Sequence, residues 1–170
     1  ENLRQIYIKS RKETKLSLGN TASSHSKLIY FQKMLEKVKF KGIPSKAIEL
    51  ESLYWNTYLN EINSERKLVD LFRDISERKI NIGIITDLTA QVQMKKLIKL
   101  GIENYINVIV TSEEAGLDKP NFSCFSLANE KLNPENKKYS YWMVGNDVTK
   151  DLIGAKVELE AKTFLVNYPK

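Results

Sequence analysis

Three short stretches of this 170-residue sequence place reactive side chains where predicted strands and helices meet. Thr86 and Asp87 follow an apolar run, Lys119 precedes a proline, and Asp147 and Asp151 lie four residues apart after another apolar run. Two carboxylates on one strand-to-helix loop suit a hard divalent cation, Mg²⁺ above all. A lysine and a threonine from neighbouring loops suit the non-bridging oxygens of a phosphoryl group. Together these stretches predict a site for phosphate and magnesium.

Each stretch has an ordinary structural explanation when it is taken alone. Threonine ends many strands, and a Lys-Pro pair is common where a helix begins. Either Asp147 or Asp151 alone would be expected only to cap the helix that follows. Gly145, just before them, would let the backbone bend tightly enough to bring the carboxylates inward. The combination is what indicates a site.

The elements that must position these residues alternate between strands and helices in the second half of the chain. Apolar runs predict strands over 80–86, 108–111, 139–144 and 163–166, and helices over 89–100, 121–132 and 150–157. A further helix is predicted from about residue 64, with an inward face of Leu68, Leu71, Phe72 and Ile75. This alternation predicts an α/β fold, a Rossmann-like three-layer core with a parallel sheet. Any site would lie beyond the carboxyl ends of its strands.

The first half of the chain is predicted to be entirely helical. Helices are expected around 3–11, from a cap at Ser24 through Val38, and again from about Ser45. The aromatic residues of the last of these, Tyr54, Trp55 and Tyr58, are explained at least as well by packing as by ligand stacking. The predicted division is therefore an all-helical domain over residues 1–62 and an α/β core over residues 63–170.

Composition limits the classes of partner. The 27 Lys and Arg exceed the 21 Asp and Glu by six, which suits anionic partners. The basic residues are scattered, and runs such as Lys95, Lys96 and Lys99 are typical of solvated helix faces, so nucleic-acid binding is not expected. No apolar stretch approaches the roughly 20 residues that span a bilayer. The lack of an apolar secretion segment and the single cysteine favour a cytoplasmic protein.

Two isolated residues could suggest other chemistry. His25, the only histidine, falls in a polar stretch without a Gly-x-Ser-x-Gly turn, so an exposed loop histidine is expected. Cys124 lies beside two phenylalanines on a predicted helix and is expected to be a buried small apolar residue. Neither residue supports a nucleophile–histidine pair.

The order of the three stretches resembles the haloacid dehalogenase superfamily. Ile84 to Asp87, Gly116 to Pro120 and Val144 to Ala155 resemble that family's second, third and fourth motifs. The helical first half resembles its cap. The resemblance implies that Thr86 binds the transferring phosphoryl oxygen, that Lys119 steadies the charge shared by nucleophile and phosphate, and that Asp147 and Asp151 hold Mg²⁺. A second alignment of the last motif puts Asn146 at the first acidic position.

One feature of that family has no counterpart in this sequence. Members begin with an Asp-x-Asp-x-Thr-like motif on a central strand, where the first aspartate attacks phosphorus. The strand would lie between those ending at Thr86 and near Gly145, and without it two sheet edges would be unpaired and would favour oligomers. Two explanations compete. The chain is a fragment of a longer polypeptide, which the retained Thr86, Lys119, Asp147 and Asp151 favour, or a relative that has lost catalysis.

The resemblance implies an enzyme. We expect a Mg²⁺-dependent phosphatase that acts on a small phosphorylated metabolite when the nucleophile strand is present, with this chain inactive alone. Dehalogenation is the alternative chemistry within the family. A non-catalytic module that binds phosphate and metal, or an unrelated α/β ligand-binding domain, is the alternative outside it.

Overall fold

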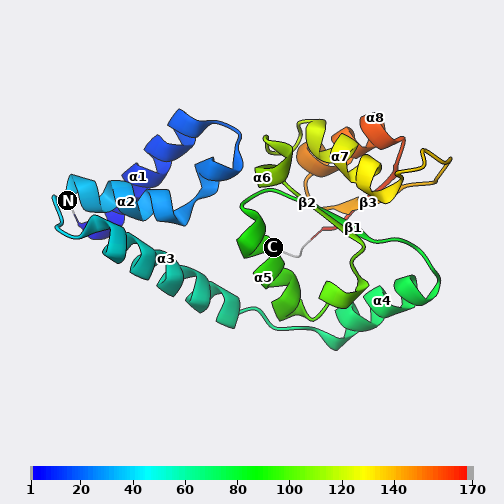
Figure 1. Ribbon diagram of the computed structural model, residues 1–170, viewed down its shortest axis with the longest axis horizontal. Coiled ribbons are helices and arrows are strands. Elements are labelled where there is room, and N and C mark those ends of the chain that lie inside the picture. Colours follow the sequence, from blue (N-terminus) through cyan, green and yellow to red (C-terminus); the bar gives the residue numbers. More distant parts are fainter. Residues whose placement is uncertain (1, 168–170) are drawn as a thin grey trace.

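The structure, a computed structural model, describes residues 2–167 and shows an all-helical region, here called the cap, beside an α/β region, here called the core (Figure 1). The cap contains α1 (Leu3–Leu18), the 3-10 turn η1 (Ala22–His25), α2 (Lys27–Lys37) and α3 (Ile43–Asn60). The core contains α4 (Arg66–Glu77), β1 (Gly83–Thr86), α5 (Ala90–Leu100), η2 (Glu103–Tyr105), β2 (Val108–Thr111), α6 (Ser112–Ala115), α7 (Ser123–Leu132), β3 (Trp142–Gly145), the π-helical turn η3 (Val148–Ile153), α8 (Gly154–Leu159) and β4 (Lys162–Leu165). None of the described helices is both long and apolar enough to cross a lipid bilayer.

The cap is held together by the apolar faces of its helices. Met34 and Leu35 of α2 are buried against Ala47 of α3, and Tyr7 of α1 packs onto the same cluster. The start of α2 differs from the prediction, because the N-cap is Ser26, whose hydroxyl accepts a hydrogen bond from the Ile29 amide. The polar stretch before it folds into η1, so the helix begins later than the sequence suggested.

The strands form two parallel pairs instead of one continuous sheet. β1 pairs with β2, with Ile85 opposite Val110, and β3 pairs with β4, with Val144 opposite Phe164. Within residues 2–167, no hydrogen-bonded ladder joins the two pairs. The parallel strands and intervening helices confirm the predicted α/β fold class.

The core between the two pairs is built around α7. Cys124 is fully buried and packs with Val110 of β2, as the sequence predicted. On the other side, the buried cluster of Phe125, Ala155 and Ala161 packs against Ile85 of β1 and Met143 of β3. One buried cluster therefore contacts both of the strand pairs that lack a common ladder.

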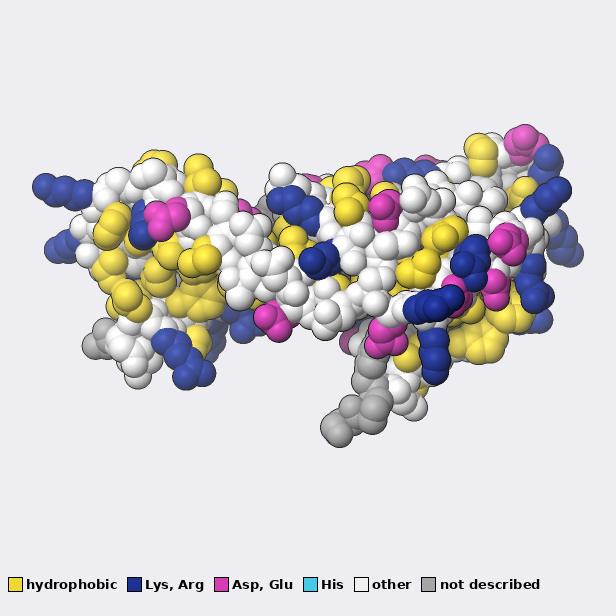
Figure 2. All heavy atoms as spheres, turned by 90° about the horizontal axis from the view of Figure 1, so that it is seen from below, with side chains coloured by type: hydrophobic (Ala, Val, Ile, Leu, Met, Phe, Trp, Pro, Cys, Tyr) yellow, Lys and Arg dark blue, Asp and Glu magenta, His cyan; other side chains and the backbone are white. Residues whose placement is uncertain are grey.

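Parts of the core surface remain apolar. The prediction that α4 turns Leu71 inward is wrong, because that side chain is 54% exposed. The helix lies at the edge of the core in Figure 1 and contacts mainly η2, so no sheet layer covers its apolar side. Trp142 and Val144, on one face of β3, are also exposed. Figure 2 shows hydrophobic side chains at the surface of both the cap and the core.

Candidate functional site

Lys119 stands at the centre of the predicted site and joins the two strand pairs. Its ammonium nitrogen lies 2.6 Å from Oδ1 of Asp151 and donates to the Ile85 carbonyl oxygen at 3.2 Å. Its backbone N–H donates to Oδ1 of Asp87 at 2.9 Å. The lysine is therefore fixed at its backbone by the loop after β1 and at its tip by β1 and η3.

Asp151 is a buried and fully engaged carboxylate. Its Oδ2 accepts hydrogen bonds from the backbone N–H groups of Asn146 and Asp147, each at 3.1 Å, while Oδ1 faces Lys119. Burial alone would raise its pKa, but the hydrogen bond and charge of Lys119 and these two amides outweigh it and hold the pKa of Asp151 below its usual value. The aspartate is therefore an anion that orients the lysine.

Gly145 is required by the close approach of Asp151. A Cβ atom at Gly145 would lie 2.5 Å from the Asp151 Cβ and 2.7 Å from its Oδ2, which is inside any tolerable contact. The sequence predicted that Gly145 would let the backbone bend inward. The structure shows that the glycine instead leaves room for the Asp151 carboxylate to pack directly over the backbone at the end of β3.

A cavity of about 270 Å³ lies between the two strand pairs, at the ends of β1 and β3. Its wall includes Ile85, Lys119, Met143, Asn146, Asp151 and Val166. An ammonium group has three N–H donors, and those of Lys119 have two partners among the described residues, Asp151 and Ile85. One donor remains available to an anion in the cavity.

The other two predicted site residues are near this centre but turn their polar atoms elsewhere. The Thr86 hydroxyl donates to the carbonyl oxygen of its neighbour Asp87 at 3.2 Å. Asp147 caps η3, because its Oδ1 accepts from the Lys150 amide at 2.9 Å. The structure thus joins Lys119 to Asp151 directly. Asp147 reaches Asp151 through its own backbone N–H, whereas Thr86 lies between two residues, Ile85 and Asp87, that bond to Lys119. Their functional roles stay predictions.

The oxygen atoms at the end of β3 match the donor chemistry of a divalent cation but form only part of a binding set. Within the described residues, no group of three Asp, Glu, His or Cys side chains could hold a metal ion. Asn146 lies in the cavity wall and Asp147 beside it, so either could be a first oxygen ligand. A complete octahedral shell would need further oxygens.

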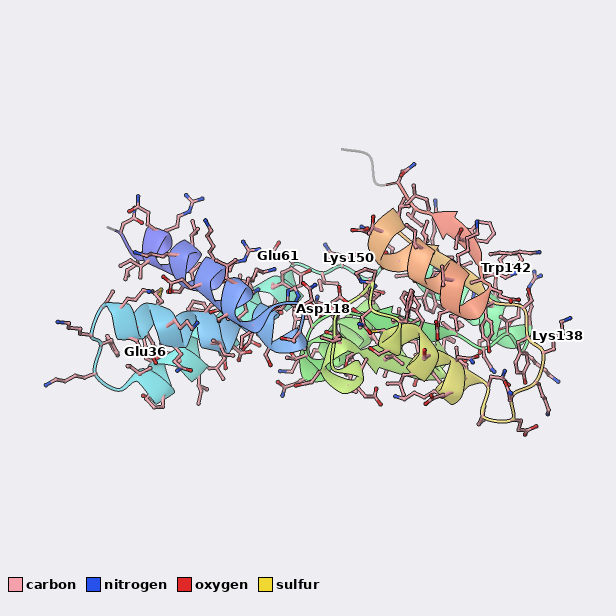
Figure 3. The ribbon with its side chains drawn as sticks, turned by 90° about the horizontal axis from the view of Figure 1, so that it is seen from above. Glu36, Glu61, Asp118, Lys138, Trp142 and Lys150 are labelled. Carbon is pink, nitrogen blue, oxygen red and sulfur yellow. The ribbon has the colours of Figure 1, made fainter. Side chains whose placement is uncertain are left out.

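The cap contributes a contact that the sequence did not reveal. His25 in η1 lies 2.7 Å from Oδ2 of Asp118 through its Nε2, and the Asp118 amide donates to the Asn20 carbonyl oxygen. The expectation of an exposed loop histidine is wrong, since the His25 side chain is only 21% exposed. Figure 3 shows Asp118 where the cap meets the core. Asp118 precedes Lys119, so the cap is attached next to the central lysine.

Asp87 is a second residue whose positioning role the sequence did not assign. Its side chain holds the Lys119 amide, and Lys150 approaches its other oxygen at 3.8 Å. Its place directly after Thr86 at a strand end was the only local signal. Nothing in the sequence near Lys119 indicates that Asp87 will reach it.

Comparison with known proteins gives a consistent result. The sequence profile of the family described as "Haloacid dehalogenase-like hydrolase" matches residues 5–166. A ribulose-1,5-bisphosphate 5-phosphatase from Halopiger xanaduensis is 33% identical over 165 residues, which are 96% of this chain and 68% of that protein. A glyceraldehyde 3-phosphate phosphatase from Methanothermobacter thermautotrophicus is 33% identical over 82 residues, 48% of this chain and 35% of that protein.

Solved structures show the same fold. A HAD phosphatase from Thermococcus onnurineus superposes with a TM-score of 0.64 at 18% identity, covering 97% of this chain and 76% of that one. The HAD-hydrolase YfnB from Bacillus subtilis, crystallised with magnesium, also gives 0.64, at 17% identity over 97% of this chain and 72% of that one. At these identities the likeness concerns the fold alone.

Proposed function

Since the chain belongs to the haloacid dehalogenase-like hydrolase family, we propose that it forms the cap and most of the core of a Mg²⁺-dependent phosphatase for small phosphorylated metabolites. The two relatives are named for a bisphosphate and for a monophosphate, and a small phosphorylated metabolite is the class common to both. The observation that carries the proposal is the Lys119–Asp151 pair at 2.6 Å beside a cavity at the strand ends.

The nucleophile would come from a further strand placed between β1 and β3. Both strands have an edge without a ladder partner among the described residues, and the buried cluster of Phe125, Ala155 and Ala161 contacts both pairs. A strand inserted there would satisfy those edges and would bring its carboxyl end to the cavity. We propose that a preceding segment of a longer protein supplies this strand with an aspartate pair.

Lys119 would then stabilise negative charge during phosphoryl transfer. The first aspartate on the inserted strand would attack phosphorus and displace the alcohol of the ester, which the second aspartate would protonate. Water would then attack the aspartyl phosphate, release inorganic phosphate and restore the carboxylate. The free N–H of Lys119 would steady the negative charge that the nucleophile and the phosphoryl group share. Asp151 would keep Lys119 protonated and would hold its ammonium group beside the cavity, because it is a buried anion whose Oδ1 lies 2.6 Å from the ammonium nitrogen. Thr86 would rotate its hydroxyl from the Asp87 carbonyl oxygen to a second phosphoryl oxygen.

The chain's own ligands for magnesium would be Asp147 or Asn146, with Asp151 acting through water. A bound Mg²⁺ would neutralise charge on the transferring group. Asp151 is the weaker direct ligand, because both its oxygens already accept hydrogen bonds or face Lys119. A cytoplasmic location and the absence of nucleic-acid partners stay predictions from the sequence.

The proposal is tested by hydrolysis of p-nitrophenyl phosphate by this chain and by a longer form that includes the aspartate pair. We expect Mg²⁺-dependent turnover from the longer form and none from this chain. Lys119→Ala in the longer form should lower kcat about 100-fold or more. Turnover without Mg²⁺ would contradict the proposed requirement for this ion. Absence of turnover from both forms would favour a non-catalytic module.

Separate variants distinguish the two candidate metal ligands. In the longer form we compare Asp147→Ala with Asn146→Ala. The variant that removes the metal ligand should raise the Mg²⁺ concentration needed for half-maximal activity. The other variant serves as its matched control, because the two residues are adjacent at the end of β3. An unchanged Mg²⁺ requirement in both would contradict this assignment.

A further inference from the structure

A cluster of cations lies where the cap meets the core, apart from Lys119. Lys27 is the first residue of α2, and Lys96 lies on α5. Arg11 and Lys15 of α1 are close enough that their charges, with that of Lys96, act on Lys27. We call these four residues the cap cation cluster. They come from three helices that are distant in the sequence.

Aromatic rings form the wall that holds the two inner lysines. The Lys27 ammonium lies 5.0 Å from the ring centroid of Tyr30, 5.3 Å from that of Tyr54 and 5.5 Å from that of Trp55. The Lys96 ammonium lies 5.8 Å from the same Trp55 ring. The prediction that Lys96 belongs to a solvated face is therefore wrong, since it is half-buried against an aromatic wall from the cap.

The inner lysines have no acidic partner within the part of the chain that the structure describes. Other lysines on the molecule do, for example Lys37 with Glu13 and Lys131 with Glu114. Burial lowers the pKa of Lys27 to about 8, and Arg11, Lys15 and Lys96 add to the effect. Aromatic faces attract a cation but cannot neutralise it. Within the described residues no carboxylate compensates the charge of these two lysines, and an added anion would do so.

The position of the cluster relates it to the cavity at Lys119. Lys27 follows His25 by two residues, and His25 contacts Asp118, which precedes Lys119. Lys96 is in the second turn of α5, the helix that begins after Thr86 and Asp87. Both inner lysines lie by the Trp55 ring, and each belongs to an element that adjoins a residue contacting Asp118 or Lys119.

We propose that the cap cation cluster binds a second phosphate of the substrate, so that the substrates are small metabolites with two phosphate groups. The inference rests on the proposed phosphatase function and adds to it the class of substrate. A phosphate dianion would pair with several cations at once, and the rings of Trp55 and Tyr58 would border the carbon skeleton. One phosphate would be hydrolysed at Lys119 while the other stays on the cap.

The first test measures anion binding without catalysis. Trp142 is replaced by Phe, so that Trp55 is the only tryptophan, and inorganic phosphate is added at constant ionic strength while its fluorescence is recorded. We expect a saturable change that Lys27→Met or Lys96→Met weakens about tenfold or more, the loss expected for one charge-assisted hydrogen bond. Lys95→Met, an exposed neighbour on α5, is the matched control and should change the affinity less than about twofold.

Three outcomes would overturn this proposal. They are a Trp55 signal that does not saturate, an equal response to acetate, which would show only general attraction of anions, and equal weakening by Lys95→Met. Circular dichroism of each variant shows whether the cap helices remain folded. Arg11→Gln gives a second variant on another helix, and it should also weaken binding.

The second test uses the longer form and separates this inference from the proposed function. The ratio of kcat/KM for a sugar bisphosphate to that for the matching monophosphate should fall about tenfold in Lys27→Met and stay within about twofold in Lys95→Met. An unchanged ratio with ordinary hydrolysis would overturn the second-phosphate site alone. If neither ester is hydrolysed, the proposed phosphatase function is overturned. The fluorescence titration would still show whether the cap cation cluster binds phosphate.

Discussion

Lys119 in the core and Lys27 in the cap are both partly buried lysines, but their surroundings differ in charge. Lys119 lies against the Asp151 carboxylate at 2.6 Å, and a backbone carbonyl oxygen accepts a further hydrogen bond. Lys27 lies among three aromatic rings with further cations nearby. The core lysine is therefore compensated before any ligand arrives. The cap lysine is not compensated by any described carboxylate, and in our proposal a phosphate of the substrate supplies the missing negative charge.

The sharpest test of this contrast is removal of the core lysine. Lys119→Met leaves the Asp151 carboxylate buried without its cation, and the free energy of unfolding should fall by about 3 kcal/mol, as measured by urea denaturation. The matched control is Lys131→Met, which breaks a surface pair with Glu114 and should cost less than about 1 kcal/mol. Equal losses in the two variants would show that Lys119 is no better compensated than a surface lysine.

Gly145→Ala tests how tightly the core pair is held. The new Cβ would overlap the Asp151 side chain, and we expect a loss of about 2 kcal/mol in the free energy of unfolding. In an Asp151→Gly background the same change should cost about 0.5 kcal/mol or less, because the overlapping atoms are gone. If the loss in free energy of unfolding stays at about 2 kcal/mol in this background, Gly145 is needed for its backbone conformation and not to make room for Asp151.

His25→Ala tests the contact that connects the two regions. Asp118 is 5% exposed and its Oδ2 has His25 as partner, so the loss should destabilise the protein by about 1–2 kcal/mol. The Asp118 amide, which donates to Asn20, should also exchange its hydrogen faster. Ser23→Ala, an exposed change in the same turn, should stay within about 0.5 kcal/mol. An unchanged exchange rate at Asp118 would contradict a role in attaching the cap.

The cap lysine should also make the stability of the protein depend on pH. Because the pKa of Lys27 is about 8 in the folded protein and near 10.5 when unfolded, the unfolded state binds more protons between these values. The stability of the unmodified protein should therefore rise between pH 8 and 10.5 relative to that of Lys27→Met. The measurement is the difference in urea midpoint across this range. A constant difference would show that Lys27 is solvated like a surface lysine.

The core elements could be predicted from the sequence because their signals are local. Apolar runs identified the four strands of residues 2–167, and the loops that follow two of them contain Lys119 and Asp151, which the structure brings together. Burial of Cys124 followed from its apolar neighbours on a helix. These features depend on periodicity and on the parallel arrangement of strands, both of which a single sequence contains.

Two contacts that the sequence did not reveal depend on how the cap lies on the core. The partner of His25 is 93 residues away, and Lys96 meets aromatic rings that belong to the cap. Neither contact leaves a periodic pattern. The exposure of Leu71 was missed for the opposite reason, since its helix has a clear apolar face but the described core offers little to cover it.

The position of Asp118 has a mechanical consequence. Its amide and carboxylate are held by Asn20 and His25 of the cap, whereas the next amide, that of Lys119, is held by Asp87 of the core. Two consecutive amides are therefore held by the two parts of the molecule, which are also linked by residues 61–65 and by the contact of Lys96 with Trp55. A rotation of the cap relative to the core would therefore shift the backbone of Lys119 and, with it, the position of its ammonium group.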